Sequence, residues 1–178
     1  MRKKERSGNP VLTPFIMSAG IIVLDQLTKL LIVKNIEPNT IGSRILGNFI
    51  WIVHAQNLGM AFSIGHSFPL IARRILFVLL PLIVLAFVVV YYFRGSDLSK
   101  GMRWAMAGIL GGGIGNLIDR ILRPDGVVDF VSLKFYGLFG MQRFPAFNVA
   151  DSCITVCGIL LVVLFIAQEM KGREQENK

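Results

Sequence analysis

The stretch ILFVLLPLIVLAFVVVYYF, residues 75–93, decides what kind of protein this chain is. It carries no charged side chain, and roughly 20 apolar residues make a helix long enough to cross the hydrocarbon core of a bilayer. Pro81 lies within it, but neighbouring helices can satisfy the carbonyl group that a proline leaves free inside a membrane. The stretch therefore predicts a transmembrane helix.

The remainder of the chain fits a small membrane protein. It has 178 residues, of which 53% are hydrophobic and 17% charged, and its mean hydropathy is +0.61. These values are typical of membrane proteins, and the length suits one domain over residues 1–178. We expect an all-α membrane protein with four transmembrane helices of roughly 20 residues each. Their expected ranges are about 12–33, 70–93, 102–122 and 149–168.

The third of these segments is rich in glycine. Gly111 and Gly115 are four residues apart and form a small-xxx-small face. This pattern favours close packing of that helix against a neighbour.

Basic residues set the expected orientation of the helices. The formal net charge is +8, but the Lys and Arg residues do not form a stripe interleaved with aromatic residues, so no nucleic-acid partner is expected. They gather instead near both termini and between the second and third spans. The positive-inside rule makes these places cytoplasmic. Both termini are then cytoplasmic, and the connections at 35–69 and 123–147 face outward.

Parts of both outer connections have the composition of strands. The stretches FIWIVHA at 49–55 and VVDFV at 127–131 are rich in β-branched and aromatic residues. The first predicts one or two short strands on the outer surface, and the second predicts an extended segment.

Several polar residues interrupt or border the spans, where charged and amide side chains are costly and often functional. Given the expected orientation, they all lie in or near the outer leaflet, whereas a random scatter would not select one leaflet. These residues are Asp25, Lys29, Asn57, Asn116, Asp119, Arg120, Asp129, Asn148 and Asp151.

Each of these residues also has a purely structural interpretation. Asp25 and Lys29 have the spacing of an ion pair within one helix. Arg120 could orient a functional carboxylate or merely neutralise one. Asn148 is a good helix N-cap, and Asp151 would fall in the first turn of the last helix, where an acid suits the helix dipole.

Paired carboxylates offer a chemistry that needs no metal and no covalent nucleophile. Two carboxyl groups in a partly dry site cannot both remain ionised, so one is expected to hold a proton. The ionised group can activate a water molecule, and the protonated group can donate a proton to a developing oxyanion. Asp129 is the acid hardest to explain structurally, because it interrupts an apolar run. From spacing alone, however, any two of the acids could form the pair.

Other functional classes find less support. Cys153 and Cys157 lie one helical turn apart and are read as packing residues rather than as a metal or redox pair, since no further Cys or suitably spaced His completes a site. An ion-coupled transporter would place polar residues toward both membrane faces, but the cytoplasmic halves of the second and fourth spans are almost wholly apolar. A non-catalytic assembly factor packed through the glycine-rich helix remains a further alternative.

Five short motifs resemble those of the lipoprotein signal peptidases, also called signal peptidase II, and they occur in family order over almost the whole chain. They are LDQLTK (24–29), QNLGMAFS (56–63), GGIGNLIDR (112–120), VVDF (127–130) and FNVADS (147–152).

The resemblance implies a catalytic dyad of Asp129 and Asp151. It implies that Asn57, Asn116, Arg120 and Asn148 are polar support for the site, and that Asp25, Lys29 and Asp119 have supporting roles. The family fold is four transmembrane helices with a small extracytoplasmic β-sheet cradle and a short surface helix.

The same resemblance implies a location and partners. The location is the bacterial cytoplasmic (inner) membrane, with the site toward the extracytoplasmic face. The partners are diacylglyceryl-modified prolipoproteins and membrane lipid, the expected inhibitors are cyclic peptide antibiotics of the globomycin type, and no cofactor or metal is implied.

Overall fold

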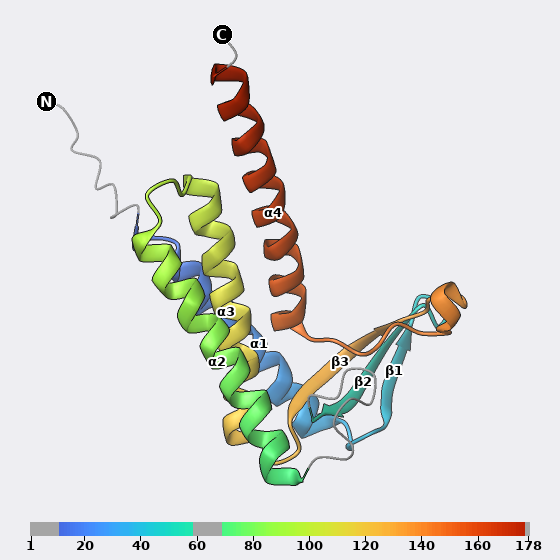
Figure 1. Ribbon diagram of the computed structural model, residues 1–178. Helices are drawn as coiled ribbons and strands as arrows, with labels where there is room; N and C mark the ends of the chain where they lie inside the picture. Colours follow the sequence, from blue (N-terminus) through green and yellow to red (C-terminus); the bar gives the residue numbers. More distant parts are fainter. Residues whose placement is uncertain (1–10, 59–68, 177–178) are drawn as a thin grey trace, which may run out of the picture.

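The computed structural model of the protein describes residues 11–58 and 69–176. Four long helices run side by side, and a small sheet leans away from one end of them (Figure 1). The helices are α1 (Phe15–Asn35), α2 (Leu70–Arg94), α3 (Lys100–Leu122) and α4 (Val149–Glu176). Each begins within a few residues of its expected start, and α4 continues beyond the expected end at 168.

Three helical segments of the described chain are long and apolar enough to cross a membrane. They are Phe15–Asn35, Ile75–Arg94 and Val149–Gln175. They make the chain a multi-pass membrane protein, as expected. Four spans were expected, and α3 does not belong to this set because its glycines and polar residues lower its hydropathy.

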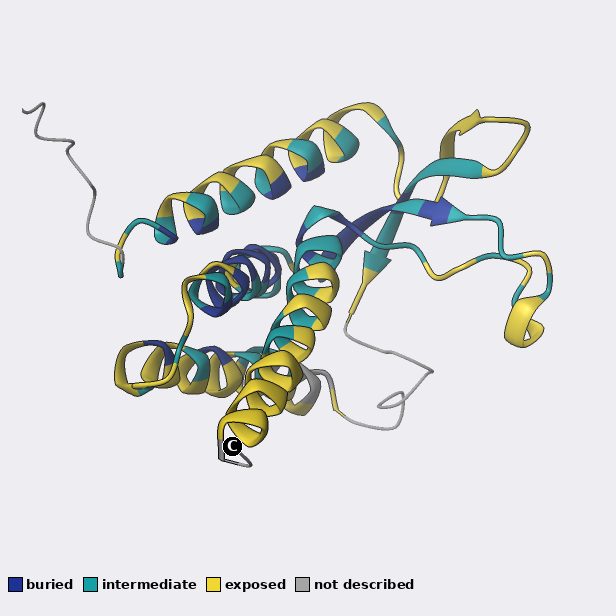
Figure 2. Cartoon of the chain, turned by 90° about the horizontal axis from the view of Figure 1, so that it is seen from above, coloured by how far each residue is buried: buried dark blue, intermediate teal, exposed yellow. Residues whose placement is uncertain are grey.

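Helix α3 lies among the other three helices and carries 12 buried residues, more than any other described element (Figure 2). Its consecutive glycines each face a different helix. A Cβ on Gly111 would lie 2.9 Å from Ser18 Cα of α1, a Cβ on Gly112 would lie 2.5 Å from the Ala150 carbonyl oxygen of α4, and a Cβ on Gly113 would collide with Leu85 of α2. Glycine is needed at these positions because the helix axes approach too closely for a side chain.

The expected small-xxx-small face lies against α1. A Cβ on Gly111 would meet Ser18 and Ile21, and a Cβ on Gly115 would lie 2.8 Å from Asp25 Oδ2. This close approach brings the polar residues of α1 and α3 into direct contact.

The outer segments form an antiparallel sheet of three strands in the order β1-β2-β3. The strands are β1 (Ile41–Ile45), β2 (Ile50–Asn57) and β3 (Val127–Leu133). The strand predictions at 49–55 and 127–131 are thereby confirmed. Phe147, just before α4, forms a bridge with Val131, which ties the last connection to β3.

The family fold includes a short surface helix in addition to the four long helices. Among the described outer residues, the helical segment is the single 3-10 turn η2 (Leu138–Gly140). Residues 59–63 of the motif at 56–63 lie outside the described residues.

Candidate active site

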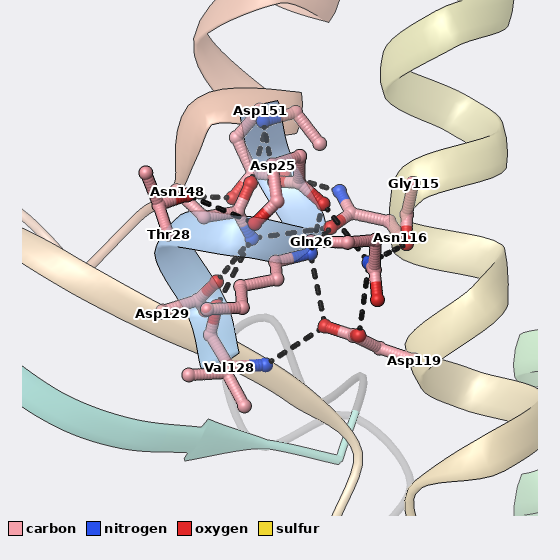
Figure 3. Close-up of polar contacts among 12 residues, drawn as sticks. Asp25, Gln26, Thr28, Gly115, Asn116, Asp119, Val128, Asp129, Asn148 and Asp151 are labelled. Atoms are coloured by element: carbon pink, nitrogen blue, oxygen red, sulfur yellow. Dashed lines mark hydrogen bonds and ion pairs between the residues drawn. The ribbon is translucent and has the colours of Figure 1, made fainter. Parts of the chain in front are cut away.

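The expected site residues come from five elements and meet where α1, α3 and the start of α4 face β2 and β3. Figure 3 shows Asp25, Asn116, Asp119, Asp129, Asn148 and Asp151 close together. Eight of the nine form one continuous network of hydrogen bonds and ion pairs, and the ninth, Arg120, lies within electrostatic range of it. The eight are Asp25, Lys29, Asn57, Asn116, Asp119, Asp129, Asn148 and Asp151.

Asp129 lies on β3 and is 2% exposed. Its Oδ2 accepts a hydrogen bond of 3.0 Å from Asn57 Nδ2, and its Oδ1 accepts one of 2.7 Å from Asn148 Nδ2. The register of the sheet causes the first contact, since Ala55 of β2 pairs with Asp129 and Asn57 pairs with Val127. Strand pairing therefore brings an amide from β2 to a carboxyl group on β3.

Asp151 lies in the first turn of α4, where it forms a reciprocal capping arrangement with Asn148. The Asp151 backbone N–H donates to Asn148 Oδ1 at 2.9 Å, and the Asn148 backbone N–H donates to Asp151 Oδ2 at 3.2 Å. This is the capping box, with Asp in place of the usual Glu. The interpretation of Asn148 as an N-cap is confirmed, and the cap also orients the Asp151 carboxyl group.

Asn148 is the residue that joins the two carboxyl groups. Its side-chain oxygen accepts from Asp151, while its Nδ2 donates to Asp129. The same Nδ2 also contacts the carbonyl oxygen of Val128 at 3.4 Å and Asn116 Oδ1 at 3.1 Å. Because Asn148 is 1% exposed, its amide is held in one orientation by protein groups.

A buried cluster centred on Lys29 adjoins the two carboxyl groups through Asn116. The Lys29 Nζ contacts Asp25 Oδ2 at 2.8 Å, Asp119 Oδ2 at 2.9 Å and Asn116 Oδ1 at 2.9 Å. The side chains of Lys29, Asp25 and Asp119 have no solvent-exposed area. All three ammonium donors are satisfied, which is the condition for keeping such a charge buried. The expected ion pair of Asp25 and Lys29 is present, and Asp119 joins it.

Asp25 and Asp119 of this cluster also hold the backbone segments that carry Asp151 and Asp129. Asp25 Oδ1 accepts from the backbone N–H of Ala150 at 3.0 Å, and Asp119 Oδ2 accepts from the backbone N–H of Val128 at 3.2 Å. Ala150 directly precedes Asp151, and Val128 directly precedes Asp129. Each buried acid therefore fixes the backbone one residue before a candidate catalytic carboxyl group.

Two members of the network were missed at the sequence level. Gln26 Nε2 contacts the Gly115 carbonyl oxygen at 3.0 Å and also Asp25 and Asp119, each at 3.2 Å. Arg123 Nε pairs with Asp119 Oδ1 at 3.0 Å. Both residues could have been recognised from the sequence, because Gln26 is an amide within a span and Arg123 is four residues after Asp119.

Arg120 differs from the other site residues. Its Nε is buried and has no hydrogen-bond partner among the described residues. Its charge interacts with the charges of Asp151, Asp129 and Asp119. It also lines a groove of about 570 Å³ beside α2, with Val78 and Leu82. Arg120 could orient a functional carboxylate or neutralise its charge, and this placement favours the neutralising role.

The charges of the site indicate which form of the carboxyl groups is stable. Four acids (Asp25, Asp119, Asp129, Asp151) face three cations (Lys29, Arg120, Arg123), so one proton balances the site. Burial, together with the charge of Asp151, raises the pKa of Asp129 to about 7, against the lowering effects of Asn57, Asn148 and Lys29. Asp129 is therefore suited to hold that proton near neutral pH.

The described residues contain no group of three His, Cys, Asp or Glu side chains arranged to hold a metal ion. Cys153 and Cys157 are both free thiols and half-buried on α4. Cys157 packs against Gly108 of α3, in agreement with a packing role.

Sequence comparisons identify the relatives of this chain. The family model described as signal peptidase (SPase) II matches residues 17–167. A lipoprotein signal peptidase of Treponema pallidum is 49% identical over 164 residues, covering 92% of this chain and 88% of that protein. One of Treponema denticola is 45% identical over 164 residues, covering 92% and 94% respectively.

A solved structure shares the fold. It is that of a bacterial membrane enzyme determined by the in meso method, with a TM-score of 0.74 and 27% sequence identity. The match covers 95% of this chain and 94% of that chain.

Proposed function

The chain belongs to the signal peptidase II family and is therefore a peptidase, and from this premise we propose that it removes signal peptides from diacylglyceryl-modified prolipoproteins. The scissile bond is the peptide bond just before the lipidated cysteine. The reaction is aspartic, with Asp129 and Asp151 as the dyad and one water molecule as the nucleophile. Family membership removes the reasons for considering a transporter or a non-catalytic assembly factor.

The observation that carries this proposal is the double contact of Asn148, whose one amide group touches Asp129 at 2.7 Å and the Asp151 backbone N–H at 2.9 Å. The Asn148 backbone N–H also donates to the Asp151 carboxyl group at 3.2 Å, so this one residue contacts both carboxyl groups, which supports their acting on one amide bond. Their environments also differ: Asp129 is buried within the sheet, while Asp151 is half-exposed at a helix start. Different environments are the usual basis for separate acid and base roles.

In the proposed reaction, Asp151 accepts a proton from the water molecule as its oxygen attacks the scissile carbonyl carbon. Asp129 gives its proton to the carbonyl oxygen, and a neutral tetrahedral intermediate results. Asp151 then passes the water-derived proton to the leaving amine, the C–N bond breaks, and Asp129 recovers its proton from the intermediate. The dyad is restored, and the products are a free carboxyl group and a free amino group.

The other polar residues have positioning roles in this proposal. Asn57 and Asn148 orient Asp129, and Asn116 orients Asp151. Arg120 balances the charge of the dyad. Asp25, Lys29 and Asp119 hold α1, α3, β3 and α4 together beneath it.

The orientation in the membrane follows the distribution of charge. We propose one domain with four crossings, in which α3 crosses the bilayer surrounded by the other helices, so that its low hydropathy faces protein rather than lipid. Both termini are cytoplasmic, and the dyad faces outward in the cytoplasmic (inner) membrane of a bacterium. A substrate held by its lipid and its signal helix would present its cleavage site at this level. Globomycin-type cyclic peptides would compete for the same site.

The test uses the purified full-length protein in lipid with a diacylglyceryl-modified prolipoprotein. The wild type should cleave before the modified cysteine, and Asp129→Asn and Asp151→Asn should each lower the rate by at least about 10²-fold while remaining folded. Asp125→Asn is the matched control, because Asp125 is an exposed acid shortly before β3. Wild-type cleavage by Asp129→Asn would refute the dyad, and cleavage of an unmodified precursor at the same rate would refute the substrate class.

A further inference from the structure

The far end of the sheet, away from the helices, is built from two turns. One is the β1–β2 turn at residues 46–49, and the other is the connection after β3 that includes η2. They are joined by a hydrogen bond of 2.8 Å from the Lys134 backbone N–H to the Phe49 carbonyl oxygen, and by the stacked rings of Phe49 and Tyr136 at 6.5 Å. The two turns therefore form one surface, which we call the sheet tip.

The sheet tip exposes large apolar side chains from both turns. Phe139 is 83% exposed, Leu46 72% and Tyr136 71%, and Leu138 beside Phe139 is also exposed. Single exposed apolar residues are ordinary, but a cluster of them at the end of a projecting element marks an interaction surface.

The backbone conformation at three of these positions is a further sign that the exposed side chains have a function. Leu46, Tyr136 and Phe139 have φ angles of 51°, 53° and 52°, in the left-handed region that favours glycine or asparagine. A turn selected only for its backbone shape would carry those residues. Instead, three bulky apolar side chains occupy strained positions from which they project outward, which indicates that the side chains themselves are needed.

Basic side chains border the apolar ones. Lys134 lies over the Tyr136 ring at 4.8 Å, and Arg44 and Arg143 both lie over the Trp51 ring, at 5.1 and 3.8 Å. Aromatic rings together with Lys and Arg are the residues that collect at the boundary between hydrocarbon and lipid headgroups. This composition matches a lipid surface better than a protein groove.

The position of the sheet tip agrees with this composition. In Figure 1 the sheet does not extend straight beyond the helix ends; its far end is level with the first turns of α4, well short of the outermost ends of α1, α2 and α3. A surface at that level beside the helices lies at the depth of the outer leaflet when the helices span the bilayer.

We propose that Leu46, Tyr136, Leu138 and Phe139 insert into the outer leaflet of the same membrane that the helices cross and anchor the sheet to it. The inference rests on the membrane orientation given under the proposed function. The sheet is then held at two ends, by the buried cluster at Asp119 and by lipid at the tip. Such a two-point attachment would fix the sheet over the lipid surface from which a membrane-bound substrate must enter.

The test measures the depth of the sheet tip by spin labelling. A nitroxide is attached at Phe139→Cys or Leu46→Cys in a Cys153→Ser, Cys157→Ser background, and the protein is reconstituted in phosphatidylcholine–phosphatidylglycerol vesicles. Power saturation should show several-fold greater accessibility to oxygen, which concentrates in the bilayer, than to a water-soluble nickel chelate. Glu37→Cys, at an exposed position after α1, is the aqueous control and should show the reverse.

An aqueous profile at both tip positions, equal to that of Glu37→Cys, would overturn the anchor. Protection that develops only after a prolipoprotein is added would also overturn it, because the tip would then bind substrate rather than lipid. If the cysteine-free background fails to fold, Phe139→Trp in the otherwise native chain should gain fluorescence quenching by brominated lipids relative to the wild type. Neither readout depends on peptidase activity, so an inactive protein with a membrane-inserted tip would contradict the proposed function and leave the anchor standing.

Discussion

The Nζ of Lys29 donates a hydrogen bond of 2.9 Å to Oδ1 of Asn116, and this contact decides which way the Asn116 amide faces. An ammonium group can only donate, so the amide oxygen must point toward Lys29 and the amide nitrogen away from it. That nitrogen donates to Asp151 Oδ1 at 2.7 Å. The buried cluster thus reaches a candidate catalytic carboxyl group through one oriented amide.

Replacing Asn116 with alanine should therefore impair catalysis more than binding. Asp151 would lose a donor, and a hydrogen bond to a charged group contributes about 1.5–3 kcal/mol. We expect kcat to fall by roughly tenfold to a hundredfold with little change in KM, measured by steady-state cleavage of a lipidated precursor. Gln168→Ala on α4 is the control, because Gln168 lies exposed far along that helix. An unchanged kcat would mean that Asp151 does not depend on this amide.

Replacing Lys29 with methionine should destabilise the whole protein. Methionine has a similar length, but Asp25 and Asp119 would then be buried without their shared cation. Breaking a buried ion pair in this way costs about 3–5 kcal/mol. Thermal unfolding in detergent should show a large drop in Tm for Lys29→Met, and Lys34→Met, at an exposed position in the last turn of the same helix, should show little change.

Activity should fall as the pH rises through the pKa of Asp129. Burial raises that pKa to about 7, and the proposed reaction needs the protonated form. The pH profile of kcat/KM should therefore lose activity tenfold per pH unit on the alkaline side of about 7. A profile that stays flat to pH 9 would show that Asp129 does not serve as the acid.

The same pKa predicts a slope in stability. Between the usual value of 3.8 and about 7, the unfolded chain has lost the Asp129 proton while the folded protein keeps it. The buried neutral carboxyl group therefore makes its full contribution to the free energy of unfolding below pH 3.8. This contribution, on the order of 4 kcal/mol, is lost as the pH rises through about 7. The Tm of the wild type should decline across this interval, and that of Asp129→Asn should decline less.

Adding one methyl group at Gly112 should disturb the site without removing any of its polar side chains. A Cβ there would lie 2.5 Å from the Ala150 carbonyl oxygen and 2.8 Å from Ile154 Cγ1, so the start of α4 would have to shift. Overpacking of this kind costs about 1–3 kcal/mol. Gly112→Ala should lower both Tm and cleavage rate, while Gly158→Ala, whose Cβ would meet nothing within 4 Å, should leave both near wild type.

Most of the secondary structure could be predicted because its signals are local. Uninterrupted apolar runs of membrane-spanning length mark α2 and the apolar part of α4, and β-branched residues mark β2 and β3. Helix α3 lies at its expected position, but it does not have the hydropathy expected of a transmembrane span. Its glycines lower its hydropathy because they serve contacts with three other helices, which a count of apolar residues does not register.

The candidate site was only partly accessible from the sequence. Charged residues inside spans could be recognised as unusual, and the motif resemblance selected Asp129 and Asp151 among them. Gln26 was overlooked because an uncharged amide next to Asp25 and Lys29 is a weaker signal than either charge. Its role follows from reaching the Gly115 carbonyl oxygen on another helix, which no spacing along the chain reveals.

By itself, the sequence determined that this chain resides in a membrane, where its helices lie and which residues are too polar for their surroundings, because these properties depend on the composition of short segments. Only the tertiary structure decided which groups contact each acid. Lys29 takes Asp25 and Asp119 into a closed ion cluster, and Asn148 links the remaining two, Asp129 and Asp151. The physical reason is that a buried charge must be matched by groups that reach it in space, and those groups come from α1, α3, β3 and α4, which are far apart along the chain.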